Sequence, residues 1–279
     1  MINMIDYNDF YDYMIKSFNL KESTAKMYES AVRQFFNFVK KRPDEVEVSD
    51  LINFFRYLYD NNYSSSYMVV CHSALKTFYD YLIYIGLIDR NIPREFKRRF
   101  RTERKFPVVM TEDELYRIVR LPFDYRYFED KAMQESSIMV VLATTGIRIG
   151  ELKTIEFCGD TIKVYGKRSK ERYVPIIHKF VGEDLSYEAW EYFLDNNLKN
   201  ISVRSVQKIV ERYRKKLGTN KKITPHTFRH TYATLLLKNG VDLLTLKNIL
   251  GHDSIYTTEI YIHMNNEDLL NKLKDLKII

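Results

Sequence analysis

The chain has 279 residues, of which 45% are hydrophobic and 29% are charged, and its formal net charge is +7. This length predicts one large domain or two modest ones, and the composition excludes a chain that is disordered throughout. The basic balance favours a polyanionic partner.

Two cysteines, Cys71 and Cys158, exclude a disulfide framework and indicate a reducing compartment, so we expect a cytoplasmic protein. Residues 1–14 lack the order of a signal peptide, in which a basic region leads an apolar run. The greasiest stretch, residues 136–145, is too short to span a bilayer, so no membrane partner is expected.

Residues 1–92 predict a compact bundle of about four amphipathic helices. We expect Ser23 or Thr24 to cap one helix and Ser49 to cap a second, while a longer helix runs from about Ser65 to Ile85 and stops at Gly86. The expected apolar stripes of the first two helices contain Met27, Ala31, Phe35 and Val39, and Ile52, Phe55 and Tyr59.

Residues 93–108 predict a basic linker between two domains, because prolines bracket the segment and the apolar periodicity disappears. From Arg90 to Lys105 there are eight basic residues and only two acidic ones. One interpretation is a solvated linker, and the other is a contact with a polyanion.

Residues 109–279 predict a second domain that is mainly helical and contains a small antiparallel β-sheet. Two β-branched, alternating runs, 161–165 and 172–177, flank the turn GKRSKE and indicate a hairpin. Helices are expected at about 111–120, 131–145, 186–198, 202–217, 226–239, 242–249 and 266–277.

His226 and Arg229 are the most informative candidates for chemistry. Pro225 suits a first helical position, so His226 lies in the first turn, where free N–H groups and the helix dipole favour an anion. The alternative is that His226 packs and Arg229 is exposed.

His226 and His230 have the spacing of zinc ligands, but no glutamate stands next to the first histidine as in metalloproteases, so we expect no metal.

Other candidates have ordinary structural explanations when each is taken alone. Arg148, with Glu151 three residues on, can simply complement a helix end and form an ion pair. Lys167 shares a short turn with Arg168, Lys170 and Arg172, and turn cations are usually solvated. His252 follows a glycine, and a tyrosine placed like Tyr261 between two isoleucines is more often half-buried core.

Taken together, four segments resemble the tyrosine recombinase (phage integrase) family, in particular its Xer-like members. TGIRIGEL (145–152) resembles the first arginine box, and YGKRSKERYVPI (165–176) resembles the hairpin that carries the catalytic lysine. HTFRH (226–230) resembles the histidine-x-x-arginine box, and LGHDSIYTTEIY (250–261) resembles the terminal box. The first hundred residues agree only in kind and length with the family's DNA-gripping domain.

The resemblance implies a site-specific recombinase that breaks and rejoins DNA strands through a 3′-phosphotyrosyl link, without metal, ATP or another cofactor. It implies Tyr261 as the nucleophile, Arg148 and Arg229 on the phosphate oxygens, and Lys167 as the acid for the leaving oxygen. It further implies that His226 moves the tyrosine proton, that His252 adds a hydrogen bond, and that Glu151 supports the site. Permanently charged, bidentate guanidiniums suit a phosphate that gains charge during attack.

Double-stranded DNA is the expected partner, gripped through Lys97, Arg98, Arg99 and Arg101 of the linker and Arg168 and Lys170 of the hairpin. The apolar stripe in 266–277 packs on its own domain or, as the family implies, docks on a neighbouring subunit within a tetramer on DNA. The sequence leaves room for accessory proteins. Two alternatives remain, a catalytically silent DNA-binding regulator and a type IB topoisomerase-like relaxing enzyme.

Overall fold

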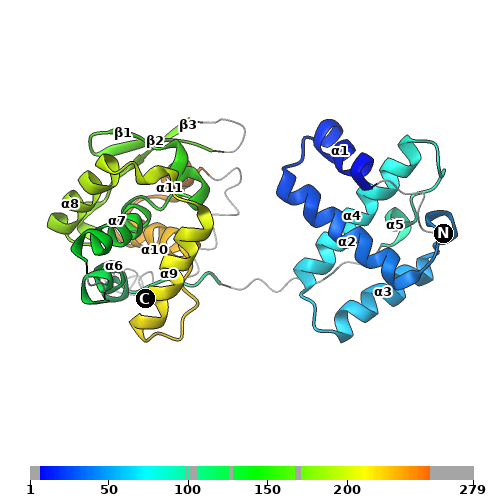
Figure 1. Ribbon diagram of the computed structural model, residues 1–279, viewed down its shortest axis with the longest axis horizontal. Helices are drawn as coiled ribbons and strands as arrows, with labels where there is room; N and C mark the ends of the chain where they lie inside the picture. Colours follow the sequence, from blue (N-terminus) through cyan, green and yellow to red (C-terminus); the bar gives the residue numbers. More distant parts are fainter. Residues whose placement is uncertain (1–6, 98–99, 101–105, 126–127, 167–170, 252–279) are drawn as a thin grey trace, which may run out of the picture. The chain divides into compact units, whose positions relative to one another are not determined.

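The computed structural model describes residues 7–97, 100, 106–125, 128–166 and 171–251. The chain divides into two compact units, Met1–Arg104 and Lys105–Ile279, here called the N-terminal and C-terminal units (Figure 1). The division falls within the segment that the sequence predicts as a linker. The last predicted helix, 266–277, lies outside the described residues.

The N-terminal unit is built from helices around an aromatic-rich core. Its α-helices are α1 (Tyr7–Phe18), α2 (Glu22–Val39), α3 (Val48–Asp60), α4 (Ser65–Tyr84) and the short α5 (Ile92–Glu95), with a 3-10 turn η1 (Pro43–Glu45) between α2 and α3. Phe10, Phe35, Phe54 and Phe78 are fully buried. The expected end of α4 is confirmed, because Gly86 has φ +73°, where residues with a Cβ are strained.

The predicted starts of α2 and α3 are wrong. Helix α2 begins at Glu22 with Lys21 as its N-cap, so Ser23 and Thr24 already lie in the first turn. The negative charge of Glu22 stabilises this end of the helix, because it lies at the positive end of the helix dipole. Helix α3 begins at Val48, and the backbone N–H of its N-cap residue, Glu47, donates to Asp50 Oδ2 at 2.9 Å. A carboxylate thus replaces the expected serine cap.

The buried stripes also differ in part from the prediction. Helix α2 buries Ala31 and Phe35 as expected but leaves Met27 41% exposed. Helix α3 buries Leu51, Phe54, Phe55 and Leu58. Ile52 and Tyr59, expected on that stripe, are exposed, because the core face of α3 is turned by one residue toward its neighbours.

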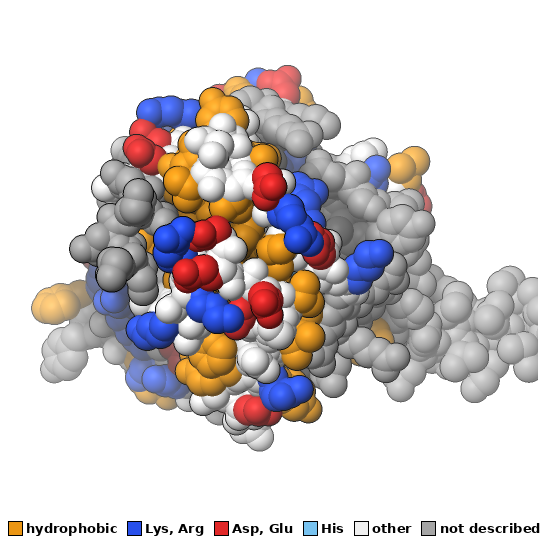
Figure 2. Space-filling model, turned by 90° about the vertical axis from the view of Figure 1, so that its right-hand side faces the viewer, with side chains coloured by type: hydrophobic (Ala, Val, Ile, Leu, Met, Phe, Trp, Pro, Cys, Tyr) orange, Lys and Arg blue, Asp and Glu red, His pale blue; other side chains and the backbone are white. Residues whose placement is uncertain are grey.

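The first part of the predicted linker packs on the N-terminal unit. Pro93 and Phe96 are buried there, and Phe96 stacks on Phe55 with ring centroids 5.3 Å apart. Some of the basic charge is also neutralised locally, because Arg90 pairs with Glu95 at 3.0 Å and Arg94 with Asp80 at 2.7 Å. Figure 2 shows one face of this unit, on which acidic, basic and hydrophobic side chains are interspersed.

The C-terminal unit places a small sheet beside a group of helices (Figure 1). Its helices are α6 (Glu112–Tyr125), α7 (Glu129–Thr145), α8 (Glu183–Asp195), α9 (Val203–Leu217), α10 (Pro225–Lys238) and α11 (Leu243–Leu250), with 3-10 turns η2 (Ile149–Thr154), η4 (His178–Phe180) and η5 (Leu198–Asn200). The strands β1 (Glu156–Cys158), β2 (Thr161–Tyr165) and β3 (Glu171–Pro175) form an antiparallel sheet in that order. The mainly α fold with a small antiparallel sheet is thereby confirmed.

Helix α7 is the centre of the C-terminal unit. Residues 135–145 are all buried, and the helix packs against α6, α8 and α10. Its one buried carboxylate, Glu135, accepts hydrogen bonds from Arg212 Nη1 at 2.6 Å and from Tyr213 Oη at 2.5 Å, both on α9. No helix in the described part of the chain is long and apolar enough to cross a membrane.

The predicted hairpin is confirmed as β2 and β3, in which Val164 lies opposite Arg172. Alternation decides which side chains face inward: Ile162, Val164 and Val174 are buried. The turn residues 167–170 lie outside the described residues.

Candidate active site

Arg148 follows the end of α7 and lies at the start of η2. Gly146 ends α7 in the left-handed conformation, with φ +59°, and its N–H donates to the carbonyl of Leu142. The Arg148 side chain, 36% exposed, donates from Nη1 to Glu151 Oε1 at 3.1 Å and from Nη2 to the carbonyl of Gly251 at 3.0 Å. The expected pairing with Glu151 is present, and Arg148 remains open to a ligand.

Arg229 and His226 extend from the first turns of α10, where Pro225 takes the first helical position as expected. The structural alternative in which His226 packs and Arg229 is exposed is wrong, because Arg229 is only 4% exposed whereas His226 is exposed. Arg229 Nη1 donates to the carbonyl of Gly146 at 3.0 Å, and Nη2 donates to that of Leu250 at 2.5 Å. Its guanidinium therefore links three segments.

Three arginines, Arg148, Arg172 and Arg229, donate hydrogen bonds to the last turn of α11 and are here called the arginine cluster. The carbonyls of Ile249, Leu250 and Gly251 accept hydrogen bonds from guanidiniums, and Gly251 ends the helix with φ +63°. Carbonyls at a helix C-terminus lack helical partners and carry the negative end of the dipole, so they stabilise cations. The helix end therefore helps to hold several positive charges together.

Glu151 is the buried carboxylate of the cluster, with its side chain 7% exposed. Burial acts to raise its pKa, but hydrogen bonds and charge from Arg172, together with Arg148, outweigh burial and hold the pKa of Glu151 below its ordinary value. Glu151 therefore stays ionised and balances part of the positive charge.

Arg172 is a site residue that the sequence does not single out, because there it is one of several cations beside the hairpin turn. Its Nη1 and Nη2 donate to the two oxygens of Glu151 at 3.0 and 2.7 Å, and its Nε donates to the carbonyl of Ile249 at 2.7 Å. The available signal was the period of two in β3, which puts Arg172 on the same face as buried Val174.

Two histidines of α10 lie in this positive environment. Although His226 is exposed overall, partial desolvation of its imidazole, followed by the positive charges of Arg229 and Arg148, lowers its pKa. Burial and the neighbouring His226 and Arg229 lower the pKa of His230 to about 4. Both imidazoles are therefore neutral at pH 7, and the exposed His226 can accept a proton.

This state of His226 predicts the pH dependence of any reaction in which it acts as a base. Because its pKa lies below the ordinary value of about 6.5, the rate should stay level down to about that pH and then fall as the imidazole becomes protonated. The single-turnover rate of DNA cleavage, the activity that the resemblance implies, checks this when it is measured at constant ionic strength across the acid range. The acid limb should disappear in His226→Gln, and a limb centred above pH 7 would contradict the assignment.

Gly146 allows the close approach of α10 to the end of α7. A Cβ at this position would lie 2.4 Å from Cδ1 of Tyr232, and the positive φ adds strain. Gly146→Ala should therefore destabilise the protein by about 2–5 kcal/mol, measured by denaturant unfolding. The control is Gly150→Ala, because a Cβ there would meet no atom within 4 Å, so its effect should stay within about 0.5 kcal/mol. Equal stability of the two variants would contradict this prediction.

The remaining candidates are only partly covered by the structure. Lys97 is exposed, whereas the other predicted site residues lie outside the described residues, namely Arg98, Arg99, Arg101, Lys167, Arg168, Lys170, His252 and Tyr261. The structure thus brings together Arg148, Glu151, His226 and Arg229. Two guanidiniums beside a neutral imidazole form a site for an anion with a labile proton nearby.

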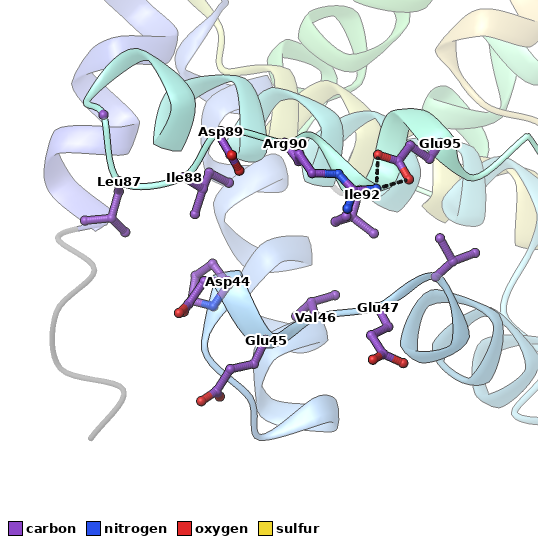
Figure 3. Close-up of a pocket in the computed structure, with 13 residues that line it drawn as sticks. Asp44, Glu45, Val46, Glu47, Leu87, Ile88, Asp89, Arg90, Ile92 and Glu95 are labelled. Atoms are coloured by element: carbon purple, nitrogen blue, oxygen red, sulfur yellow. Dashed lines mark hydrogen bonds and ion pairs between the residues drawn. The ribbon is translucent and has the colours of Figure 1, made fainter.

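A cavity of about 750 Å³ lies elsewhere, in the N-terminal unit (Figure 3). Its lining carries five carboxylates, and Arg90 is its one basic residue and pairs with Glu95. Negative charge at this density does not suit a phosphate, so the arginine cluster is the better candidate site. Within the described ranges, no group of three or more His, Cys, Asp or Glu side chains could hold a metal ion.

Comparison with known proteins finds matches to one family in both units of the chain. Residues 108–268 match the model of the phage integrase family, and residues 7–89 match the N-terminal SAM-like domain of phage integrases. The tyrosine recombinase XerC of Thermodesulfovibrio yellowstonii is 31% identical over 267 residues, which cover 88% of this chain and 87% of that protein.

Solved structures show the same fold. The XerH site-specific recombinase, in a post-cleavage complex with a palindromic difH substrate, matches with a TM-score of 0.72 and 18% identity over 98% of this chain and 85% of that one. The lambda integrase tetramer bound to a Holliday junction matches with a TM-score of 0.70 and 17% identity over 91% and 76%. With a family model that covers most of the C-terminal unit and a relative above 30% identity along most of its length, this chain belongs to the phage integrase family, the tyrosine recombinases.

Proposed function

We propose that this protein is a site-specific DNA recombinase that cleaves and rejoins DNA strands through a 3′-phosphotyrosyl intermediate on Tyr261. One observation carries the proposal: Arg148 and Arg229 converge around the last turn of α11, immediately before the segment that contains His252 and Tyr261. The proposed nucleophile therefore lies in the sequence shortly after the helix end at which the two arginines would bind the scissile phosphate.

In the proposed reaction, the Tyr261 hydroxyl attacks the scissile phosphorus while His226 accepts its proton. The bond from phosphorus to the 5′ oxygen breaks, and Lys167 protonates that oxygen. Arg148 and Arg229 stabilise the charge on the non-bridging oxygens, and His252 donates a further hydrogen bond. A tyrosine with an ordinary pKa near 10 needs such an acceptor, and the neutral state of His226 at pH 7 meets that need.

Rejoining reverses these steps. The 5′ hydroxyl of a second strand attacks the phosphotyrosine and Lys167 accepts its proton, while His226 returns a proton to the Tyr261 oxygen, which leaves as the phenol. The energy of the broken phosphodiester is conserved in the covalent link, so the reaction needs neither ATP nor a metal.

The proposed substrate is double-stranded DNA in the cytoplasm. Its phosphates would be bound by basic residues of the linker and of the hairpin turn, namely Lys97, Arg98, Arg99, Arg101, Arg168 and Lys170.

Strand exchange requires two DNA sites at once, and we propose a tetramer coupled through residues 266–277. The apolar stripe of this segment is Leu269, Leu270, Leu273 and Leu276. The lambda integrase, which has the same fold, is a tetramer on a Holliday junction, and this supports the proposed number of subunits.

Covalent trapping tests the proposal. The wild-type protein is mixed with a nicked suicide duplex made from DNA that flanks its own gene, and denaturing gels reveal any protein–DNA adduct. We expect a site-dependent adduct whose modified peptide contains Tyr261. Tight binding without an adduct would favour a silent DNA-binding regulator. Relaxation of supercoiled DNA without sequence preference would favour a topoisomerase-like enzyme.

A further inference from the structure

Arg172 joins two parts of the C-terminal unit that are far apart in sequence. From β3, its guanidinium donates two hydrogen bonds to Glu151 in η2 and one to the carbonyl of Ile249 in α11. Its side chain is 10% exposed and that of Glu151 is 7% exposed, so solvent hardly screens the contact. One side chain thereby links the β2–β3 hairpin to η2, which contains Glu151, and to the end of α11, the helix that precedes His252 and Tyr261 in the sequence.

The geometry requires an arginine rather than any cation. The planar guanidinium serves the two oxygens of Glu151 with Nη1 and Nη2 while Nε reaches Ile249, whereas a lysine offers a single ammonium centre. The helix end also packs closely on this side chain, because a Cβ at Gly251 would lie 3.0 Å from Cδ and 3.1 Å from Nε of Arg172.

Arg172 and Arg148 share the Glu151 carboxylate, and both donate to the end of α11, although to different carbonyls. Glu151 accepts from Nη1 of Arg148 at 3.1 Å and from its backbone N–H at 2.8 Å, and the helix end accepts from Arg148 through Leu250 and Gly251. Without Arg172, the buried Glu151 carboxylate would have to rely on Arg148, whose guanidinium would be drawn away from a substrate phosphate.

We propose that Arg172 is a positioning residue for DNA cleavage, which orients Arg148 through Glu151 and holds β3 to the carbonyl of Ile249 at the end of α11. The inference rests on the proposed recombinase function. It differs from a purely stabilising role, which a buried ion pair does not necessarily have. A positioning residue affects the rate at which bound DNA is cleaved, whereas a purely stabilising ion pair affects only the fraction of the protein that is folded.

The experiment compares Arg172→Lys and Arg172→Met with the wild type on the nicked suicide duplex. Three quantities are measured: the melting temperature, the Kd for the duplex, and the single-turnover rate of adduct formation with all DNA bound. We expect both variants to bind DNA as the wild type does but to cleave about 10²-fold more slowly, because small misplacements of reacting groups have effects of this size. Lysine should not rescue the rate.

Arg212→Met is the matched control, because Arg212 also pairs with a buried carboxylate, Glu135, in the same unit. This variant should lose thermal stability but keep its single-turnover rate. A wild-type rate in either Arg172 variant, measured on folded protein below its melting temperature, would overturn the inference. Adduct formation by the wild type shows that the proposed function itself holds, so the two failures are distinguishable.

Discussion

A Tyr261→Phe protein should form no covalent adduct with nicked DNA, although it should still bind the duplex. Phenylalanine keeps the ring but lacks the hydroxyl oxygen, so no bond to phosphorus can form and the loss should be complete rather than partial. Denaturing gels measure the adduct, and a gel-shift titration of the same duplex measures binding.

Tyr256→Phe is the control, since Tyr256 lies five residues before Tyr261 in the same segment. This variant should retain the adduct. If Tyr256→Phe lost the adduct and Tyr261→Phe kept it, the nucleophile would be Tyr256, and the assignment to Tyr261 would be wrong. A loss of DNA binding in Tyr261→Phe would instead indicate damage to the fold.

Arg229→Ala should slow single-turnover adduct formation by about 10²–10³, or about 3–4 kcal/mol in the barrier, as expected for the loss of one preorganised donor. Arg229 is buried, and hydrogen bonds to Gly146 and Leu250 already hold its guanidinium, so little reorganisation is needed when a phosphate arrives. Arg229→Lys should recover little of the rate, because an ammonium cannot make these contacts and also bind phosphate in a bidentate way.

The control for Arg229 is Arg117→Ala in α6, which removes an exposed ion pair with Asp113 from the same unit. An exposed pair of this kind contributes little, so stability and rate should remain near those of the wild type. Melting curves separate loss of catalysis from loss of fold in Arg229→Ala. Wild-type-like cleavage by a folded Arg229→Ala protein would contradict the role given to this residue.

Much of the fold followed from patterns that act over a few residues. The alternation in 161–165 and 172–177 predicts the hairpin that the structure contains, and the helix expected at about 131–145 is present as α7 (Glu129–Thr145). Propensity and periodicity suffice there, because hydrogen bonding and side-chain direction within one element repeat with a fixed period.

Helix starts were less predictable, as Ser23 and Ser49 illustrate. Each hydroxyl was a reasonable cap, but the N-cap residues, Lys21 and Glu47, lie two positions earlier. The alternatives differ by about 1 kcal/mol, which packing of the helix on its neighbours easily outweighs.

By itself, the sequence determined the family, the order of the four motifs, and Tyr261 as the residue on which the proposed chemistry depends. Only the tertiary structure decided that Arg229 is buried while His226 is exposed, and that Arg172 shares Glu151 with Arg148. The physical reason is range. Glu151, Arg172 and Ile249 come from a 3-10 turn, a strand and a helix, and only the packing of these elements around one core brings their polar groups within hydrogen-bond distance.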